Sequence, residues 1–269
     1  MKKLATALVS AAAIMTMSTT AFAAENPAEA FDRVMEKNNT IQSAEIQSGV
    51  HSVILAKDVI PDGQMKVDMA MHAEMDMQDT TDLKYLAQVA SSILGQDSYS
   101  QVFYTDGYYY VDTNGVKLKY PMPLEQIISS VQTGVNTSNM ESSYMKGISL
   151  NEVNGKRVLA YEANPKKLNK NVKEALGTVM NTLGTDVNLD MNIQEMKGAY
   201  VLDDNDYIIY MTNYIVYNME VLDQPMTCIT LMETEVQNPG EPVVVTLPST
   251  DGYEDLIGLY DGVIESEVE

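Results

Sequence analysis

Apolar and polar residues alternate along two neighbouring stretches in the first third of the chain. In residues 44–54 the apolar residues Ala44, Ile46, Val50 and Ile54 stand at even positions, and in residues 65–77 every odd position is apolar. A period of two is typical of a strand that buries one face. Between the two stretches, Pro61–Gly63 has the composition of a tight turn. The pattern therefore predicts two long antiparallel strands joined at this turn.

Turn sequences predict further hairpins. Asp106-Gly107, Asn114-Gly115 and Asn154-Gly155 separate other alternating stretches, and such dipeptides are strong signals for two-residue hairpin turns. Alternation returns after residue 190. There we expect a strand that ends at Val201, followed by the strands Tyr207–Val221, Pro225–Gln237 and Pro242–Leu247.

Apolar residues spaced by three and four positions predict helices. In the first, Asn26 can cap the helix and Pro27 suits its first position. In the last, which starts at Asn164-Pro165, a continuous apolar face follows the helical period. The helices are predicted over residues 26–39, 82–94, 124–131 and 164–183.

Several of the predicted strands are unusually long. Strands of 13 to 15 residues would extend over roughly 40 to 50 Å, which exceeds the usual length and implies a sheet that coils. Each predicted helix has one apolar face, and the inside of such a sheet could bury it. We therefore expect an α+β fold in which a long curved antiparallel sheet, a half-open barrel, wraps a few amphipathic helices.

The first residues have the features of a secretory signal peptide. Lys2 and Lys3 precede an apolar run, and Ala21–Ala23 has the small-residue pattern of a cleavage site. We expect cleavage after Ala23 and a secreted or extracytoplasmic protein of the cell envelope. No later stretch is long and apolar enough to predict a transmembrane anchor. The predicted division is a signal peptide over residues 1–23, a single domain over residues 24–250 and an acidic C-terminal tail over residues 251–269.

The composition restricts the possible partners. The formal net charge is −21 at pH 7, and such an acidic chain repels nucleic acid and anionic lipid surfaces. Nucleic acid is therefore not an expected partner. Cys228 is the one cysteine of the sequence, so the fold must depend on its apolar core and not on disulfide bonds.

The order of the predicted elements resembles a known superfamily. One helix, long paired strands, a Tyr-rich meander with DGYYYV and NGVKLKYP, a helix and a second set of strands follow one another over about residues 26–248. This order resembles the LolA/LppX-like lipoprotein carriers, in particular an exported, uncharacterised Gram-positive branch. The resemblance implies a half-open barrel whose concave face, closed by helices, accepts acyl chains of lipoproteins or glycolipids. It implies no catalytic residues, and this chain lacks the lipobox cysteine that tethers many members to a membrane.

The alternating stretch over residues 65–77 consists largely of methionine. Successive side chains on one face of a strand lie roughly 6.6 Å apart, so these thioethers form a row and do not all converge on one ion. A pair such as Met69 with Met71 could still bind Cu(I). Methionine adapts to irregular neighbours, which suits either a plain core or a deformable wall for an apolar ligand. The residues expected to line such a wall are Met65, Val67, Met69, Met71, Met75, Met77, Leu176, Met180, Met211 and Ile215.

The sequence offers few groups for catalysis or metal binding. His51 and His72 are the only histidines, and the predicted hairpin is compatible with their lying directly opposite each other on the polar faces of the two strands. With Asp68 or Glu74 they could bind zinc, although exposed cross-strand pairs commonly bind nothing. Nucleophile-elbow and Gly-rich phosphate motifs are absent from the sequence. We expect no enzyme activity, no catalytic residues, no cofactor and no metal site.

These patterns predict an exported, non-enzymatic binding or carrier protein for an apolar ligand, such as a lipid or a lipoprotein acyl chain. The alternative is a cell-envelope interaction or structural protein that has a filled core and no small-molecule ligand. The exposure of the methionine face distinguishes the two predictions, because a filled core would bury that face.

Overall fold

The structure is a computed structural model of the chain, and it describes residues 25–56, 60, 62–79, 83–124, 140–170, 191–221 and 224–256. The predicted signal peptide lies outside these residues. The helix predicted over residues 124–131 also lies outside them except for its first residue. The helix predicted over residues 164–183 is described only as far as Lys170.

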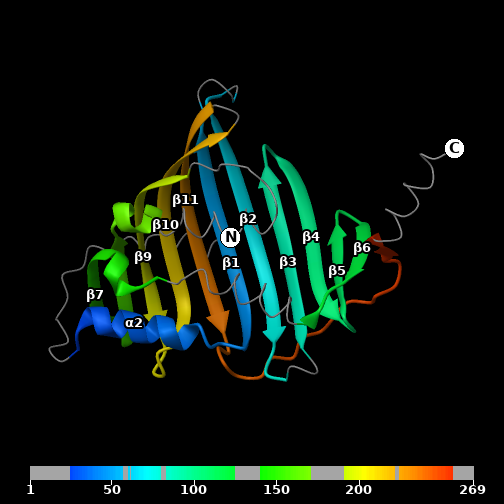
Figure 1. Cartoon of the computed structure of the whole chain (residues 1–269), viewed down its shortest axis with the longest axis horizontal. Helices are drawn as coiled ribbons and strands as arrows, with labels where there is room; N and C mark the ends of the chain where they lie inside the picture. The colour runs from blue at the N-terminus through cyan, green and yellow to red at the C-terminus, as the bar shows by residue number, and fades with distance from the viewer. Residues whose placement is uncertain are drawn as a thin grey trace. The chain divides into compact units, whose positions relative to one another are not determined.

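Strands dominate the described residues (Figure 1). They are hydrogen-bonded in the order β12-β6-β5-β4-β3-β2-β1-β11-β10-β9-β8-β7, which is an open order of 12 strands. The hairpins are antiparallel, and the short β12 is parallel to its neighbour, β6. This confirms the predicted class of a long antiparallel sheet accompanied by helix. The strands are β1 (Ser43–Leu55), β2 (Gln64–Asp76), β3 (Lys84–Ile93), β4 (Gln96–Thr105), β5 (Tyr108–Thr113), β6 (Val116–Pro121), β7 (Met145–Val153), β8 (Lys156–Ala163), β9 (Asn192–Leu202), β10 (Ile208–Val221), β11 (Gln224–Gln237) and β12 (Glu254–Asp255).

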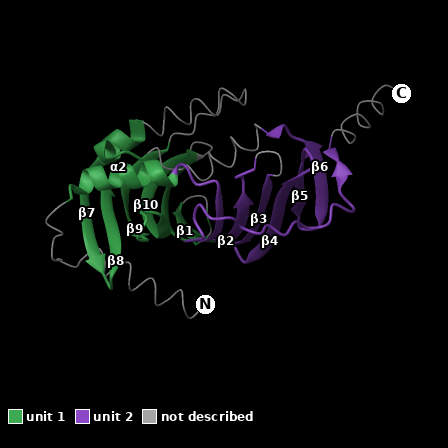
Figure 2. Cartoon of the chain, turned by 90° about the horizontal axis from the view of Figure 1, so that it is seen from below, with its two compact units in different colours: residues 1–38, 49–68, 138–235 green, residues 39–48, 69–137, 236–269 purple. Residues whose placement is uncertain are grey.

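The chain forms two compact units, which Figure 2 distinguishes by colour. Unit 1 contains α2, the second half of β1, the start of β2, strands β7 to β10 and nearly all of β11. Unit 2 contains the rest of β1 and β2, strands β3 to β6, and the chain after β11. By residue number, unit 1 is 1–38, 49–68 and 138–235, and unit 2 is 39–48, 69–137 and 236–269.

Helix α2 (Pro27–Asn38) confirms the first predicted helix. The Asn26 side chain accepts a hydrogen bond from the backbone N–H of Ala28 at 3.0 Å, which caps the first turn. Figures 1 and 2 show the helix lying across one face of strands β7 to β10. Its apolar side buries Phe31 and Val34 completely, and burial of each such side chain contributes about 1.5 to 3 kcal/mol. The buried sheet residues beneath it are Leu159, Tyr161, Tyr200, Leu202 and Ile208.

The helix predicted over residues 82–94 is wrong. Residues from Lys84 onward form strand β3, which pairs with β4 in continuous register. The connection is a two-residue turn at Leu94-Gly95, where both residues have positive φ. Leu-Gly is not among the dipeptides typical of such turns. No turn signal therefore opposed the helical spacing of the apolar residues.

The hairpin turns predicted from Asp-Gly and Asn-Gly are confirmed. Asp106, Asn114 and Asn154 have φ values of 53°, 52° and 53°, and the glycine after each also has positive φ. Asn, Asp and Gly tolerate this left-handed backbone, which matches the twist of the paired strands. The three turns join β4 to β5, β5 to β6 and β7 to β8.

The strand predicted over Pro242–Leu247 is also wrong. These residues belong to no sheet ladder, and the backbone N–H of Val243 donates instead to the hydroxyl of Ser43 at 3.1 Å. Prolines at positions 239, 242 and 248 remove backbone donors that a strand would need. The segment is therefore apolar without being a strand.

The core of unit 2 lies between strands β3 to β5 and the chain after β11. Phe103 stacks on Tyr110 with ring centroids 4.6 Å apart. Tyr253, from the end of the chain segment, meets both rings edge-on, an arrangement that aromatic quadrupoles favour. Leu86 and Val245 complete the buried cluster. Residues 242–255 thus pack into unit 2 although most of them form no strand.

Candidate functional site

Helix α2 lies on one side of the sheet in unit 1, which we call the inner face. On β10, Met211 packs against the core under α2, and Ile215 packs against a second buried cluster that includes Leu168. Side chains alternate along a strand, so the odd-numbered residues of β10 share this face. Ile215 stands opposite Thr230 of β11. The even-numbered residues of β11 therefore belong to the inner face as well.

The inner face continues onto β1 and β2 within unit 1. The hydroxyl oxygens of Ser52 and Thr230 lie 2.9 Å apart, so the even-numbered residues of β1 lie on the inner face. On the other side of the sheet, Nδ1 of His51 lies 2.7 Å from Oδ1 of Asp68. The odd-numbered residues of this part of β2 consequently point to the inner face. Four adjacent strands thus contribute to one surface.

This surface carries no charged side chain on the described parts of β10, β11, β1 and β2 in unit 1. One residue in five of the whole chain is charged (20%). The absence of charged side chains from one face of four neighbouring strands therefore distinguishes this face. Five of its residues are methionines. The inner-face residues are Met211, Asn213, Ile215, Tyr217, Met219, Met226, Cys228, Thr230, Met232, Thr234, Val50, Ser52, Ile54, Met65 and Val67.

Among the described residues, helical segments cover only part of the inner face. Besides α2, residues 165–170 are helical, and Leu168 joins Ala163 and Ile193 in a buried cluster. On β10, β11, β1 and β2 the inner-face side chains are half-buried, apart from three that are buried. A face that is apolar and half-buried can still contact a further apolar group. The three buried residues are Asn213, Cys228 and Thr234.

A buried polar cluster lies within the inner face. The hydroxyl of Tyr161 donates a hydrogen bond to the side-chain oxygen of Asn213. Gly198 of β9 leaves room for both, because an added Cβ would lie 2.5 Å from Oδ1 of Asn213 and 2.8 Å from the Tyr161 hydroxyl. Burial raises the pKa of Tyr200 to about 12 and that of Tyr161 well above its ordinary value. Both phenols are therefore neutral at physiological pH, and the cluster adds no charge.

Sulfur atoms gather on the inner face towards the end of the β10–β11 hairpin. The thiol of Cys228 lies 3.7 Å from the sulfur of Met219, and Met226 stands opposite Met219 in the register. Burial raises the pKa of the Cys228 thiol, so this group stays protonated at neutral pH. Polarizable, uncharged sulfur packs well against apolar groups. The hairpin end therefore extends the apolar character of the face.

The opposite, outer face of the same strands is charged. It carries Glu233 and Glu235 on β11 and Lys66 and Asp68 on β2. The hydroxyl of Tyr210 donates to Glu233 at 2.6 Å. Burial and, secondarily, this hydrogen bond raise the pKa of Tyr210. In unit 1, charge is thus confined to one side of these four strands.

The predicted methionine stripe of β2 changes exposure along the strand. Met69 is 40% exposed and Met71 is half-buried, whereas Met75 and Met77 are buried at 1% and 4%. The backbone carbonyl of Met75 also accepts a hydrogen bond from the Ser43 hydroxyl at 3.2 Å. The stripe therefore belongs to the buried core at Met75 and Met77 and is accessible at Met69 and Met71.

The remaining predicted wall residues divide into two groups. Leu176 and Met180 lie outside the described residues. The others share the inner face of unit 1, although they come from two strands far apart in sequence. These are Met65 and Val67 of β2 and Met211 and Ile215 of β10.

Sequence reasoning missed the contribution of β11. Met226, Cys228 and Met232 occupy alternate positions of this strand and contribute half-buried or buried sulfur to the inner face. The sequence did contain a pattern that indicates this face, because every even position from 226 to 234 is uncharged whereas Glu233 and Glu235 occupy odd positions. It was weaker than the stripe of β2 because two threonines interrupt it.

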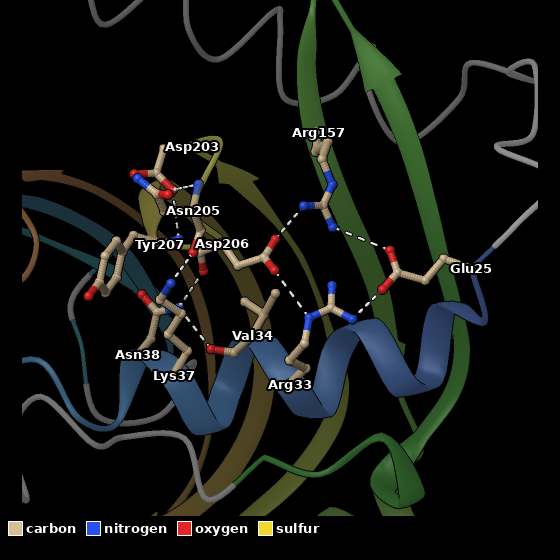
Figure 3. Close-up of polar contacts among 10 residues, drawn as sticks. All are labelled: Glu25, Arg33, Val34, Lys37, Asn38, Arg157, Asp203, Asn205, Asp206 and Tyr207. Carbon is tan, nitrogen blue, oxygen red and sulfur yellow. Dashed lines mark hydrogen bonds and ion pairs between the residues drawn. The ribbon is translucent and has the colours of Figure 1, made fainter.

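Four charged side chains form a closed ring that ties α2 to the sheet of unit 1 (Figure 3). Arg33 of α2 and Arg157 of β8 each contact both Glu25 and Asp206. The Nε atom of Arg33 lies 3.1 Å from Oδ2 of Asp206, and Nη2 of Arg157 lies 3.4 Å from Oε2 of Glu25. Because two cations meet two anions, the ring is neutral.

The turn between β9 and β10 is held by the Asp203 side chain and by the end of α2. Oδ1 of Asp203 accepts hydrogen bonds from the backbone N–H groups of Asn205 and Tyr207, both at 2.8 Å. Oδ1 of Asn38 accepts one from the backbone N–H of Ile208 at 2.9 Å. These bonds fix the turn that places Asp206 beside the two arginines of the ring (Figure 3).

The two histidines do not face each other as predicted. His51 contacts Asp68, whereas Nε2 of His72 lies 3.1 Å from Oε1 of Glu74. Nδ1 of His72 is 3.9 Å from Glu45. Over the described ranges, no group of three or more His, Cys, Asp or Glu side chains is arranged to hold a metal ion.

Comparison with known families assigns the chain. The family model described as a family of unknown function, DUF6612, matches residues 26–248. The chain belongs to the DUF6612 family. Among curated proteins, none matches it.

Several solved structures are similar to parts of the DUF6612 chain at low identity. LprF from Mycobacterium bovis is 10% identical with a TM-score of 0.34, and the match covers 84% of this chain and 100% of LprF. A beta-barrel-like protein of DUF1849 from Brucella abortus is 12% identical with a TM-score of 0.23, covering 74% and 100%. A DUF1329 family protein from Desulfovibrio piger is 10% identical with a TM-score of 0.25, covering 82% and 96%. With TM-scores below 0.5, these likenesses say nothing of what this chain binds.

None of the helices in the described part of the chain combines the length and the apolar composition that a membrane crossing requires.

Proposed function

We propose that this chain is an exported binding or carrier protein for an apolar ligand, such as a lipid or a lipoprotein acyl chain, and that it is not an enzyme. The observation that carries the proposal is the uncharged inner face of unit 1. Apolar ligands are held by surfaces of this kind, which offer few and isolated polar groups. Asn213 and the hydroxyls of Ser52 and Thr230 are among its polar groups, and each of these three already has a hydrogen-bond partner.

The methionine content supports a ligand that varies in shape. Unbranched thioether side chains repack around irregular partners more readily than valine or isoleucine, which fit a pleated strand better. Met211, Met219, Met226, Met232 and Met65 are half-buried and not fixed in a closed core. An acyl chain, which bends differently in each complex, suits such a surface.

The resemblance to the LolA/LppX-like carriers supports the same class of ligand. In our proposal the chain is an exported member of that superfamily, with its signal peptide cleaved after Ala23. The accessible end of the β2 stripe, at Met69 and Met71, forms a second apolar surface on unit 2.

Native mass spectrometry tests the proposal. Protein purified from the organism that produces it should carry additional mass in the range of a lipid, and organic extraction should remove that mass. If the intact protein has only its polypeptide mass and an apolar fluorescent probe fails to bind, the carrier role is contradicted. The alternative, a cell-envelope protein with a filled core, would then remain.

Two neighbouring substitutions on β11 identify the surface that binds. Met232→Glu places a charge on the inner face, whereas Leu231→Glu places it on the outer face, and both residues are half-buried. We expect Met232→Glu to weaken probe binding at least about tenfold, because a buried methionine contact is worth about 1.5 to 3 kcal/mol. Leu231→Glu should bind like the unaltered protein. Equal losses in both variants would contradict the assignment.

A further inference from the structure

Three sulfur-bearing side chains lie together on the inner face near the end of the β10–β11 hairpin. Sγ of Cys228 is 3.7 Å from Sδ of Met219. Met226 stands directly opposite Met219 in the strand register and precedes Cys228 by two residues on β11. Side chains that are directly opposite, or diagonal, on one face of two paired strands can touch. We call Cys228, Met219 and Met226 the sulfur cluster.

The distance between the first two sulfur atoms suits a shared metal ion. Metal–sulfur bonds are about 2.3 Å long, so two sulfur atoms on one trigonal or tetrahedral ion lie about 3.8 to 4.0 Å apart. The 3.7 Å between Cys228 and Met219 is close to that range. Plain packing also brings sulfur atoms this close. Charge and access therefore decide what the cluster can bind.

The charges of the cluster select the ion. A thiol that coordinates a metal does so as the thiolate, whereas the two thioethers stay neutral. One thiolate balances one monovalent cation, so a complex with Cu(I) has no net charge. A divalent ion would leave a positive charge on a face that has no charged side chain among its described residues, and burying an unpaired charge is costly.

The ligand types point to the same ion. Thioether and thiolate sulfur are soft ligands that suit Cu(I). Zinc is bound by cysteine, histidine and carboxylate side chains, and the cluster contains only one of these groups. It also contains no oxygen ligand for a hard cation such as Ca²⁺ or Mg²⁺. Cu(I) is therefore the ion that fits both the charge and the chemistry of the cluster.

Access differs among the three ligands. Cys228 is 1% exposed, whereas Met219 and Met226 are half-buried and still reach solvent. An ion can therefore bind the thioethers first and then the thiol beneath them. Tyr217, opposite Cys228 in the register, donates a hydrogen bond to its sulfur. Such a hydrogen bond orients a ligand and supports its charged form.

We propose that the sulfur cluster binds one Cu(I) ion through Cys228, Met219 and Met226. One bond from copper to the thiolate and two bonds to thioethers form, the thiol proton leaves to solvent, and copper keeps its oxidation state. The methionine row of β2 offers no equivalent site, because its side chains are about 6.6 Å apart and it contains no cysteine. Sequence patterns did not predict this metal site, because the register of the hairpin brings its ligands together.

Anaerobic titration of the mature full-length protein with Cu(I), in competition with a coloured Cu(I) chelator, tests the proposal. The chelator suppresses weak binding by other methionines, so the unaltered protein should take up one equivalent. Met219→Leu and Met226→Leu should each weaken this binding at least about tenfold, since even changes beside a metal ligand cost about 10- to 100-fold in affinity. Leucine replaces methionine at nearly constant volume, and urea unfolding should show that both variants keep their stability within about 1.5 kcal/mol.

Met232→Leu is the matched control. Met232 is half-buried on the same face of the same strand but stands opposite Asn213, away from the cluster. This variant should bind Cu(I) like the unaltered protein. No uptake of Cu(I) by the unaltered protein, or equal losses in Met232→Leu and the cluster variants, would overturn the proposal.

X-ray absorption at the copper edge identifies the ligands. The bound ion should have three sulfur neighbours at about 2.3 Å, and Cys228→Ala should lose the ultraviolet absorption of the copper–thiolate bond. Nitrogen or oxygen neighbours, or Zn²⁺ that displaces Cu(I) at equal concentration, would contradict the assignment. The proposal goes beyond apolar-ligand binding and does not depend on it. A failed copper titration would therefore leave the carrier role of the inner face untouched.

Discussion

At the scale of single residues, Gly198 shows how tightly the inner face is built. An added Cβ would lie 2.5 Å from the carbonyl oxygen of Thr212 as well as from Asn213. A backbone oxygen in a paired strand cannot move aside, so the polar cluster with Tyr161 depends on the absence of a side chain here. The sequence alone gave no sign of this, because a glycine within a strand does not reveal which neighbour approaches it.

Gly198→Ala should therefore destabilise the protein by about 1 to 3 kcal/mol, the usual cost of forcing an atom into a packed core. Gly147 of β7 is the matched control, since an added Cβ there meets nothing within 4 Å. Gly147→Ala should leave the stability unchanged or raise it by about 0.4 to 1 kcal/mol. Urea unfolding measures both variants. Equal stability of the two would contradict the close packing at Gly198.

Turn residues show what a sequence can and cannot predict at this scale. Asp106, Asn114 and Asn154 were identified in advance because their side chains suit positive φ. Leu94 was not, because its conformation is unfavourable for its type. The sequence also did not predict that Met75 is buried while Met69, on the same face of the same strand, is exposed. Alternation tells which side chains share a face and does not tell what covers them.

At the scale of elements, α2 is attached to the sheet in two ways. Its apolar side packs on β7 to β10, and its charged side joins the ring of Arg33, Arg157, Glu25 and Asp206 (Figure 3). The helix itself was predictable from its cap and its apolar spacing. The ring was not, since it joins Glu25 and Arg33 to Arg157 and Asp206, which are more than a hundred positions away in sequence. The strand β3 was mistaken for a helix because its turn lacked the usual residues.

Asp206→Asn should weaken the attachment of α2. Asparagine keeps the positive φ of 68° at this position but removes one of the two anions, which leaves two guanidinium groups with a single carboxylate. Because the ring is partly exposed, we expect a loss of about 1 kcal/mol or less. The loss should shrink in 1 M salt, where charges are screened. Asp204→Asn, an exposed position of the same turn, should have no effect, and a salt-independent loss in Asp206→Asn would contradict the role of the ring.

At the scale of the whole molecule, the sequence predicted an antiparallel sheet with helices packed against it, and the structure bears out this class. The long strands, their order along the chain and most of their turns followed from alternation and from Asn-Gly or Asp-Gly pairs. The division into two compact units could not be predicted from these patterns, because strands β1 and β2 contribute to both units. The position of residues 242–255 in the core of unit 2 also depends on contacts between distant parts of the sequence. The uncharged inner face was only half predicted, since it combines β10, β11, β1 and β2.

Buried tyrosines should make the stability fall at alkaline pH. Burial raises the pKa of Tyr200 to about 12 from its ordinary 10, so the folded state favours the protonated phenol. This contribution is fully present below pH 10 and is lost as the pH rises through about 12, which amounts to about 2 to 3 kcal/mol for this residue. Tyr200→Phe has no phenol to ionise, so its stability should fall less steeply over that range. Identical slopes for both proteins in urea unfolding at pH 10 to 12 would contradict the burial of this hydroxyl.

The central claim is that an apolar ligand lies on the inner face of unit 1, and the absence of tryptophan from the sequence allows a direct measurement. Met232→Trp and Leu231→Trp place one fluorophore on the inner or the outer side of the same strand. Titration with a fatty acid that carries a nitroxide quencher should reduce the emission of Met232→Trp in a saturable manner and leave that of Leu231→Trp unchanged. No quenching in either variant, or equal quenching in both, would contradict the claim.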